Sequence, residues 1–287
     1  MLLNRIGIVV KPNKEEALSV ARELTSWLAK KKVRVYLDSI VAPSIHPSLS
    51  CPREEIGRWV DLLIVLGGDG TLLSAARHLE GEKVPILGVN LGALGFLTET
   101  TLEELYPVLE RALEGNMETE GRMKLHVTVL RRGDKVGEYA VLNDVVISKS
   151  VLARIINLRN SINGAYVTTY RGDGVIISTP TGSTAYSLAA GGPILPPTLQ
   201  NFVLVPIAPH LSLDRPVVLS QGSTVEIVVH TDHQAILTTD GQNETVLKDG
   251  DRVIVKASQH VALFARVQPP SYFYRTLMSR LKGEGCD

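Results

Sequence analysis

The residues with the clearest chemical potential form a short acidic glycine turn, Gly67-Gly68-Asp69-Gly70-Thr71. The apolar run 62–66 leads into it, and residues 72–79 follow with the apolar spacing of a helix. Glycines let a ligand approach the backbone closely, and a helix N-terminus offers free N–H groups, so this turn suits phosphate. The carboxylate of Asp69 is useful beside phosphate only where a metal ion or a transferred proton is involved. An ordinary strand-to-helix turn is the alternative.

A second segment, residues 171–187, crowds hydroxyl groups, glycines and an aromatic ring around one predicted strand-to-helix junction. It reads Arg171-Gly172-Asp173-Gly174, then Val175-Ile176-Ile177, then Ser178-Thr179-Pro180-Thr181-Gly182-Ser183-Thr184-Ala185-Tyr186-Ser187. Tyr186 could present its ring to a base and its hydroxyl to a sugar or phosphate, although a half-buried core tyrosine is the alternative. Ser183 or Thr184 could equally serve only as the cap of a helix over 183–190.

Another glycine-containing loop follows a predicted strand over 84–89 and reads Asn90-Leu91-Gly92-Ala93-Leu94-Gly95-Phe96. The carboxyl end of a strand is where open α/β sheets bind their ligands, so we expect this loop to face the same ligand. A tight turn without a ligand is the alternative. The histidines and the two cysteines show no metal-ligand spacing, and no metal site within the protein is predicted.

The elements that must position these loops begin with a βαβ-like start, with strands over 6–10 and 33–37 and a helix over 15–30. The turn Lys11-Pro12-Asn13 has no glycine, so the dinucleotide fingerprint is absent and Asp38 is interpreted as a loop carboxylate. Residues 41–55 are rich in Pro and Ser and predict an exposed, mobile connection. A capping box, Thr101 with Glu104, predicts a helix that ends at Gly115.

From about Gly121 the apolar pattern changes from helical to alternating, which predicts strands. One strand is expected over 139–148, and turns are expected at Arg132-Gly133-Asp134 and Asn163-Gly164. A helix over 272–282 is expected to pack back on the first half. The predicted fold is therefore an α/β N-terminal nucleotide-binding domain (1–120), a mainly β, sandwich-like domain (121–268) and a returning C-terminal tail (269–287).

Composition narrows the class of partner. The 287 residues are 44% hydrophobic and 21% charged, with 30 basic and 30 acidic residues and a mean hydropathy of +0.11. A formal charge of zero gives no electrostatic reason to expect nucleic acid or a membrane surface, which leaves a small ligand. With two cysteines and no leader pattern or apolar run of membrane-spanning length, we expect a cytoplasmic protein.

Several segments, taken together and in order, resemble those of NAD kinases. They are the acidic glycine turn, the 90–96 loop, Asn143-Asp144, Asp173-Gly174 with Ser178 to Tyr186, Pro206-Ile207-Ala208-Pro209-His210 and Asp240-Gly241-Gln242. The Thr-Pro-Thr-Gly-Ser-Thr-Ala-Tyr block is specific to that family. The acidic glycine turn is less specific, because it is also similar to loops of diacylglycerol-type lipid kinases and phosphofructokinases. The resemblance covers the whole chain.

The resemblance implies transfer of a phosphoryl group from ATP to the 2′-hydroxyl of the adenosine ribose of NAD, producing NADP and ADP. It implies NAD and ATP as substrates, Mg²⁺ carried by ATP, and a homodimer or homotetramer with the NAD site near a subunit interface. Asp69 matches the residue that accepts the proton. The positions matching substrate-binding residues are Gly67, Gly68, Gly70, Thr71, Asn90, Asn143, Asp144, Arg171, Asp173, Thr184, Ala185, Tyr186, Ser187, Ala208 and Gln242.

The chemistry is consistent without the lysine of a P-loop, since phosphoryl transfer mainly needs positioning and charge stabilisation, which glycine N–H groups and a divalent ion can supply. Asp69 could act as the base or as a metal ligand, and the resemblance favours the base. A lipid kinase is the nearest alternative enzyme. A non-catalytic NAD(P)-binding sensor is the alternative from another class.

Overall fold

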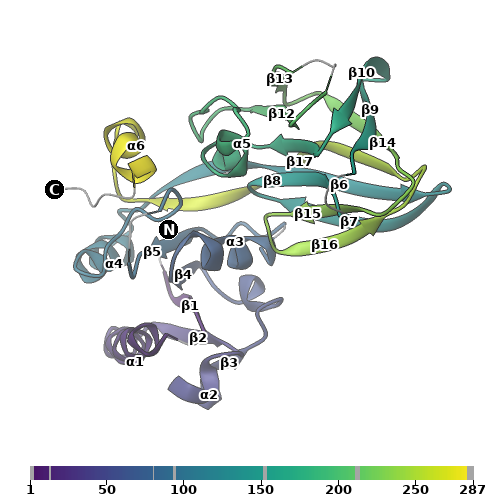
Figure 1. The fold of residues 1–287 in the computed structure, drawn as a ribbon. Helices are drawn as coiled ribbons and strands as arrows, with labels where there is room; N and C mark the ends of the chain where they lie inside the picture. Colours follow the sequence, from purple (N-terminus) through teal and green to yellow (C-terminus); the bar gives the residue numbers. More distant parts are fainter. Residues whose placement is uncertain are drawn as a thin grey trace. The chain divides into compact units, whose positions relative to one another are not determined.

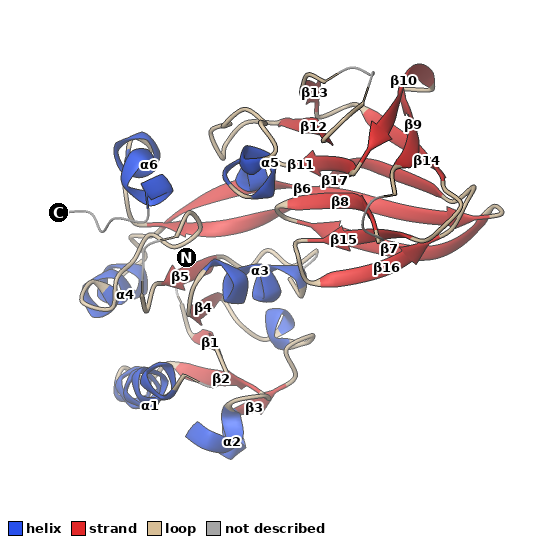
Figure 2. Cartoon of the chain, in the orientation of Figure 1, coloured by secondary structure: helices blue, strands red, loops and turns tan. Residues whose placement is uncertain are grey.

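The computed structural model describes residues 3–12, 14–79, 81–92, 95–150, 154–210 and 214–282 (Figure 1). The chain divides into two compact units, which we call unit 1 (residues 1–121 with 262–287) and unit 2 (residues 122–261). Helices belong mainly to unit 1 and strands dominate unit 2 (Figure 2). This confirms the predicted fold class, an α/β part and a mainly β part with a C-terminal helix returning to the first.

Unit 1 is built on a parallel sheet in the order β17-β5-β4-β1-β2-β3. Its strands are β1 (Arg5–Val10), β2 (Arg34–Asp38), β3 (Ser50–Cys51), β4 (Leu62–Leu66), β5 (Ile86–Val89) and the end of β17 (Arg252–Arg266). Its helices are α1 (Glu15–Lys30), α2 (Ala42–Ile45), α3 (Asp69–Arg77), α4 (Leu105–Leu113) and α6 (Tyr272–Lys282). Every residue of β4 is buried, which explains its continuous apolar sequence.

Both faces of this sheet are covered. Alternate strand residues such as Ile8 and Ile64 share one core with Leu24 of α1 and with apolar residues of α4. On the other face α3 packs so closely that a Cβ on Gly88 would lie 2.5 Å from the side chain of Leu72. The parallel pairing of β4 with β5 brings the loops after these two strands to the same edge of the sheet.

Unit 2 contains two antiparallel sheets. One has the order β10-β9-β14-β17 with β6 and β7 beside it, and the other has the order β13-β12-β11-β8-β15-β16. Their strands are β6 (Glu118–Arg131), β7 (Asp134–Val141), β8 (Asp144–Lys149), β9 (Ile156–Ile162), β10 (Ala165–Gly172), β11 (Gly174–Ser178), β12 (Asn201–Ile207), β13 (Val217–Ser220), β14 (Thr224–His230), β15 (Ala235–Thr239), β16 (Asn243–Leu247) and β17. Val127, Val145 and Ile227 join residues of both sheets in one core, as in a sandwich.

The predicted hairpin turns are confirmed. Asn163 and Gly164 connect β9 to β10 with φ values of 51° and 80°, the pattern of a type I′ hairpin. The turn between β6 and β7 likewise has positive φ at its two central residues, 132 and 133. Only half of the predicted capping box forms: Glu104 accepts a hydrogen bond from the Thr101 N–H at 3.0 Å, but α4 begins at Leu105 without a side-chain cap. Gly115 follows α4 with φ 87°, as predicted.

Most residues over 41–55 are exposed, as predicted, but this connection contains regular secondary structure and a few buried residues. The segment forms α2, a 3-10 turn and β3, and Ala42 is fully buried. Asp38, interpreted from the sequence as a loop carboxylate, ends β2 and is also fully buried. Arg53 forms an ion pair with it and donates to Ser74 Oγ at 3.0 Å, which fixes the connection to the body of unit 1.

The single strand expected over 139–148 is wrong, because β7 ends at Val141 and β8 begins at Asp144. The two strands belong to different sheets: β7 pairs with β6, and β8 pairs with β11 and β15. Between them the N–H groups of Leu142 and Asn143 donate to the carboxylate of Asp240, at 3.0 and 2.6 Å. A side chain distant in sequence therefore creates the break.

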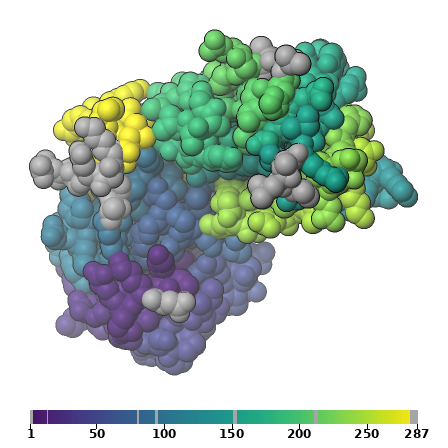
Figure 3. Space-filling model, viewed as in Figure 1, coloured from purple at the N-terminus to yellow at the C-terminus, as the bar shows by residue number. Residues whose placement is uncertain are grey.

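The helix α6 belongs to unit 1, and its exposed residues include Tyr274 and Met278. It is coloured yellow in the space-filling view (Figure 3). Among the described residues, no helix combines the length and apolarity that crossing a membrane would require. Cys286, beyond the end of α6, lies outside the described residues.

Candidate functional site

The acidic glycine turn follows β4, and α3 begins at Asp69 itself. The Gly67 N–H donates to Val89 O at 3.0 Å, and the Thr71 N–H donates to Gly68 O at 3.0 Å. A Cβ on Gly67 would lie 2.7 Å from Thr71 Oγ1, whereas a Cβ on Gly68 or Gly70 would meet nothing within 4 Å. The turn is thus closed towards the protein and open at Gly68 and Gly70, where a phosphate could approach the backbone.

The Asp69 carboxylate is held in one orientation by the loop after β5. Its Oδ2 accepts a hydrogen bond from the Phe96 N–H at 2.9 Å, and its Oδ1 accepts one from the Leu97 N–H at 3.1 Å. A Cβ on Gly95 would lie 2.6 Å from Oδ2 and closer still to Oδ1, so the carboxylate requires a glycine there. Each oxygen accepts one of these two bonds, and a carboxylate has further lone pairs to receive a proton.

Asn90 shapes the same loop. Its side chain is buried, and its amide donates to Gly92 O at 2.5 Å, while its backbone N–H donates to Thr100 O at 2.9 Å. Lys14 Nζ donates to the carbonyl of Leu91. Ala93 and Leu94 lie outside the described residues. The bonds of Asn90 therefore support the conformation of the loop whose next residues hold Asp69.

The helix α6 also contacts this loop. The guanidinium of Arg280 stacks on the Phe96 ring at 5.6 Å and donates to Thr98 O at 3.5 Å. Arg280 is buried, and its ring contact with Tyr272, at 5.0 Å, lies within α6. No sequence pattern indicates this role, because a single arginine in an amphipathic helix resembles any surface cation.

Unit 2 contains a pocket of about 370 Å³ that brings together four of the predicted binding residues. It is lined by Asn143, Asp144, Val146, Ser148, Ala185, Tyr186, Thr238, Asp240 and Gly241. Val146, Ser148, Thr238, Asp240 and Gly241 were not predicted to bind substrate. A sequence signal existed for two of them, since residues 144, 146 and 148 alternate on one face of β8. Thr238 is paired with Val146 across the sheet.

The floor of this pocket is acidic. Asp144 is 6% exposed, and burial, followed by the negative charge of Asp240, raises the pKa of Asp144 to about 7. Burial also raises the pKa of Asp240, although N–H donors from residues 142–144 and the charge of Lys124 oppose the rise. Asn143 lies beside them with its Oδ1 buried and without a hydrogen-bond partner. The pocket therefore offers a carboxyl and an amide to a ligand with hydroxyl groups.

Most hydroxyls of the 178–187 segment hold the segment itself. Thr179 Oγ1 donates to Leu142 O at 2.5 Å and accepts the Gly182 N–H at 3.1 Å. Ser183 Oγ accepts the Leu195 N–H at 2.9 Å, and Thr184 Oγ1 lies 3.4 Å from Thr181 O, to which it donates. These bonds explain the hydroxyl-rich sequence as the framework of the pocket wall.

The helix expected over 183–190 is shorter than predicted, and that prediction is wrong. A 3-10 turn spans Thr181–Thr184, α5 spans Tyr186–Ala189, and Ala185 between them has non-helical angles of −101° and −132°. The break leaves the Tyr186 side chain 47% exposed beside the pocket. Ser187 points the other way, fully buried, with its Oγ lacking a partner.

The other predicted binding residues of unit 2 do not line this pocket. Arg171 is exposed at the end of β10. Asp173 forms an ion pair with Lys149 at 2.5 Å. Ala208, exposed, has an unusual φ of 44°, and Gln242 is exposed in the turn after β15. No cluster of three or more acidic, histidine or cysteine ligands for a metal ion occurs in the part of the chain that the structure describes.

Comparison with known proteins gives one family for both units. Residues 6–117 match the family described as ATP-NAD kinase N-terminal domain, and residues 142–267 match the ATP-NAD kinase C-terminal domain. The chain is 45% identical over 273 residues to an NAD kinase of Syntrophotalea carbinolica, covering 94% of this chain and 96% of that protein. It is 42% identical over 281 residues to an NAD kinase of Geotalea daltonii, covering 98% and 99%.

Solved structures give the same result. The fold is similar to that of yeast NADH kinase complexed with NADH, with a TM-score of 0.91 and 26% identity over 98% of this chain and 88% of that chain. It is also similar to an NAD kinase from Archaeoglobus fulgidus in complex with ATP, with a TM-score of 0.78 and 27% identity over 98% and 100% of the two chains.

Proposed function

The chain belongs to the NAD kinase family, and we infer from this membership that it catalyses the ATP-dependent phosphorylation of NAD. The 2′-hydroxyl of the adenosine ribose is the acceptor, and NADP and ADP are the products. The observation that carries the proposal for the site is the Asp69 carboxylate, held by two backbone N–H groups at the start of α3 beside glycines that are open to a ligand.

Asp69 is proposed as the general base. The ribose oxygen forms a bond to the γ-phosphorus, the bond from that phosphorus to the ADP oxygen breaks, and the hydroxyl proton passes to Asp69. Its carboxylate is suited to this role because both oxygens are oriented by the Phe96 and Leu97 N–H groups. As a metal ligand, the same carboxylate would have to face the triphosphate instead.

ATP enters this scheme as its magnesium complex. The open backbone at Gly68 and Gly70, at the N-terminus of α3, is proposed to bind the triphosphate through N–H groups and the helix dipole. Gly67 and Thr71 shape the turn, and Asn90 shapes the loop beside it. The divalent ion neutralises phosphate charge as part of the substrate, which agrees with a loose transition state in which positioning and electrostatics dominate.

The pocket of unit 2 is proposed to bind the dinucleotide. Asn143 and Asp144 can bond the two hydroxyls of a ribose, since an amide and a carboxyl supply both donors and acceptors. Tyr186, half-exposed beside them, can stack on a base. Ala185 lines the same pocket, whereas Thr184 and Ser187 do not and are proposed to support the segment that carries Ala185 and Tyr186.

The exposed predicted residues have a different proposed role. Arg171, Asp173, Ala208 and Gln242 are proposed to meet the dinucleotide outside the pocket, with the partner subunit of a homodimer or homotetramer contributing to the contact. The exposure of Arg171 and Ala208 supports this, because an exposed residue is accessible to a partner subunit.

The decisive experiment follows NADP formation from ATP, Mg²⁺ and NAD, for the wild type and for Asp69→Asn. Loss of a general base lowers the rate by roughly 10²- to 10⁴-fold, and we expect that loss in turnover with NAD affinity nearly unchanged. Calorimetric titration with NAD measures the affinity. Unchanged turnover in Asp69→Asn would remove the base assignment, and tight NAD binding by the wild type without NADP formation would indicate a sensor instead.

A further inference from the structure

Asp240 stands out because its carboxylate organises the backbone on which two proposed ribose ligands lie. Its Oδ2 accepts the Leu142 N–H at 3.0 Å, and its Oδ1 accepts the N–H groups of Asn143 and Asp144 at 2.6 and 3.3 Å. The Asp240 N–H donates in return to Asp144 O at 3.0 Å. One residue from the turn after β15 thus bonds every residue of the crossover between β7 and β8.

The turn itself is unstrained, but the pairing of two acids is unfavourable. Asp240 and Gly241 have φ values of 50° and 62°, the pattern of the type I′ hairpin that Asp-Gly favours, and they connect β15 to β16. Burial raises the pKa of both carboxyls in the pocket, and the charge of Asp240 further raises that of Asp144. Two neighbouring acids that are costly to ionise together indicate a role in the pocket besides forming the turn.

We propose that Asp240 is a positioning residue for the dinucleotide pocket: its carboxylate, bonded to three successive backbone N–H groups, sets the orientation of Asn143 and Asp144 towards the ribose hydroxyls. The inference rests on the proposed function of the pocket. Asp240 acts through its neighbours, and the reacting groups do not include it.

The geometry shows why the orientation would be lost without this carboxylate. The crossover residues leave one sheet and enter the other, so the N–H groups of Leu142 and Asn143 bond the Asp240 carboxylate in place of a strand partner. With both N–H groups anchored, Asn143 lines the pocket and Asp144, beside it, begins β8. A change at residue 240 therefore moves both ribose ligands together.

The pH dependence of binding gives a second readout of the same contact. In the part of the chain that the structure describes, Asp240 follows β15, Lys124 lies on β6 and acts on Asp240, and Tyr186 begins α5 beside the pocket. Removing the charge of Asp240 removes a neighbouring charge that raises the pKa of Asp144, whose proton is then lost at lower pH.

The test compares wild type with Asp240→Asn, which tolerates the left-handed conformation and removes the charge. We expect the Kd for NAD, measured by calorimetry, and the KM for NAD to rise by about ten- to a hundredfold, the range for losing hydrogen bonds to a charged group. The KM for ATP should change less than twofold, roughly the scatter of surface substitutions. The pH dependence of the Kd for NAD, with its midpoint near 7 in the wild type, should move to lower pH.

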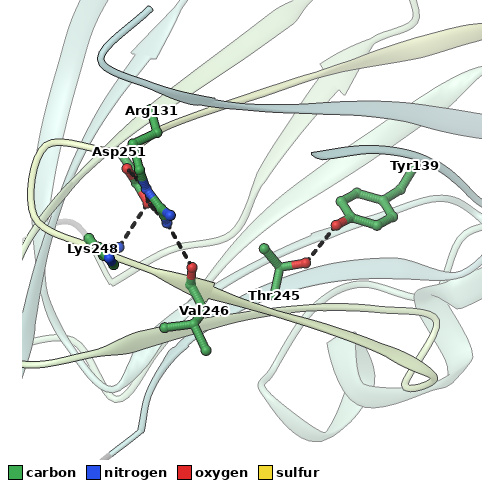
Figure 4. A network of polar contacts seen from close by, with 6 residues as sticks. All are labelled: Arg131, Tyr139, Thr245, Val246, Lys248 and Asp251. Atoms are coloured by element: carbon green, nitrogen blue, oxygen red, sulfur yellow. Dashed lines mark hydrogen bonds and ion pairs between the residues drawn. The ribbon is translucent and has the colours of Figure 1, made fainter. Parts of the chain in front are cut away.

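Asp251→Asn provides the matched control. Asp251 is 1% exposed at the end of the turn before β17, where its Oδ2 accepts the Lys248 N–H at 2.8 Å and pairs with Arg131 at 2.7 Å (Figure 4). Arg131 also donates to Val246 O at 2.9 Å. Asp251 is therefore a buried acid that holds a turn of the same unit but does not line the pocket. This variant should lose thermal stability and keep both the Kd for NAD and its pH midpoint.

The outcomes separate this inference from the proposed function. If the wild type forms NADP but Asp240→Asn binds NAD within twofold of the wild type, or with an unmoved pH midpoint, the inference is wrong and the function stands. If Asp240→Asn does not fold, Asp240→Glu replaces it, since it keeps the charge and displaces the carboxylate by one methylene group. That variant should weaken NAD binding with the midpoint unchanged; wild-type affinity would refute the inference.

Discussion

Replacing Asp144 by Asn should stabilise the ligand-free protein at neutral and alkaline pH. Asp144 is 6% exposed, and burial, together with the charge of Asp240, raises its pKa from 3.8 to about 7. Between these two values the folded state holds a proton that the unfolded state has already released. Stability from this group is therefore complete below about pH 4, falls as the pH rises, and is lost above pH 7.

The magnitude follows from the same shift. At 1.36 kcal/mol for each pH unit, the rise in pKa corresponds to about 4 kcal/mol lost between pH 4 and pH 8, as an upper bound shared with Asp240. An asparagine does not titrate between pH 4 and pH 8, so Asp144→Asn does not lose this unfolding free energy as the pH rises. At roughly 2 °C per kcal/mol for a chain of this size, its Tm at pH 8 should exceed that of the wild type by up to about 8 °C.

Thermal unfolding followed by circular dichroism at pH 5, 6, 7 and 8 measures this difference. The difference in Tm between the two proteins should widen with pH, whereas a difference that is constant across the series would refute the reasoning.

Asp251→Asn is a control for which the expected change in Tm has the opposite sign. Burial alone would raise the pKa of Asp251, but the hydrogen bond from Arg131 and others lower it overall. Asp251 thus stabilises the fold above its unfolded pKa, and its replacement should lower Tm most at pH 8.

Two further predictions concern unit 1. Gly95→Ala should lower turnover by at least about tenfold, because the added Cβ would displace the Asp69 carboxylate, and should leave the Kd for NAD within twofold of the wild type. Gly92→Ala is the control and should retain activity, because its Cβ would meet nothing within 4 Å. Arg53→Met should lower the free energy of unfolding by about 3–5 kcal/mol in a denaturant titration, because it leaves the buried Asp38 charge unpaired. A loss below about 1 kcal/mol would show that the ion pair contributes little to stability.

Local sequence signals were sufficient for most of the fold. The helix Glu15–Lys30 and the Asn163-Gly164 hairpin were predicted because their determinants, apolar spacing and positive φ, lie within a few residues. The errors share a non-local cause. The break between β7 and β8 involves an acceptor 97 residues beyond Asn143, and the 41–55 connection is held through Arg53 by Asp38, 15 residues earlier. Neither partner is visible in the local pattern.

For the candidate site, the sequence identified the residues with unusual chemistry and missed those that hold them. Asp69 is conspicuous because it interrupts a glycine turn, but the donors that orient it are the N–H groups of Phe96 and Leu97, which any residue type except proline would supply. Backbone donors carry no sequence signature. The same reason conceals Asp240, whose Asp-Gly sequence reads equally well as an ordinary turn.

The two carboxylates illustrate how similar anchoring serves different purposes. Asp240 accepts three backbone N–H groups and lies at the floor of a pocket, so its remaining capacity to take a proton from a substrate is small. Asp69 accepts one N–H group per oxygen and begins a helix beside two glycines with open space around them. Both residues are partly exposed, so their hydrogen bonds and not their burial separate their roles. The carboxylate with one bond per oxygen is the one that can take a proton from a bound hydroxyl, whereas the one with three bonds fixes the backbone of its neighbours.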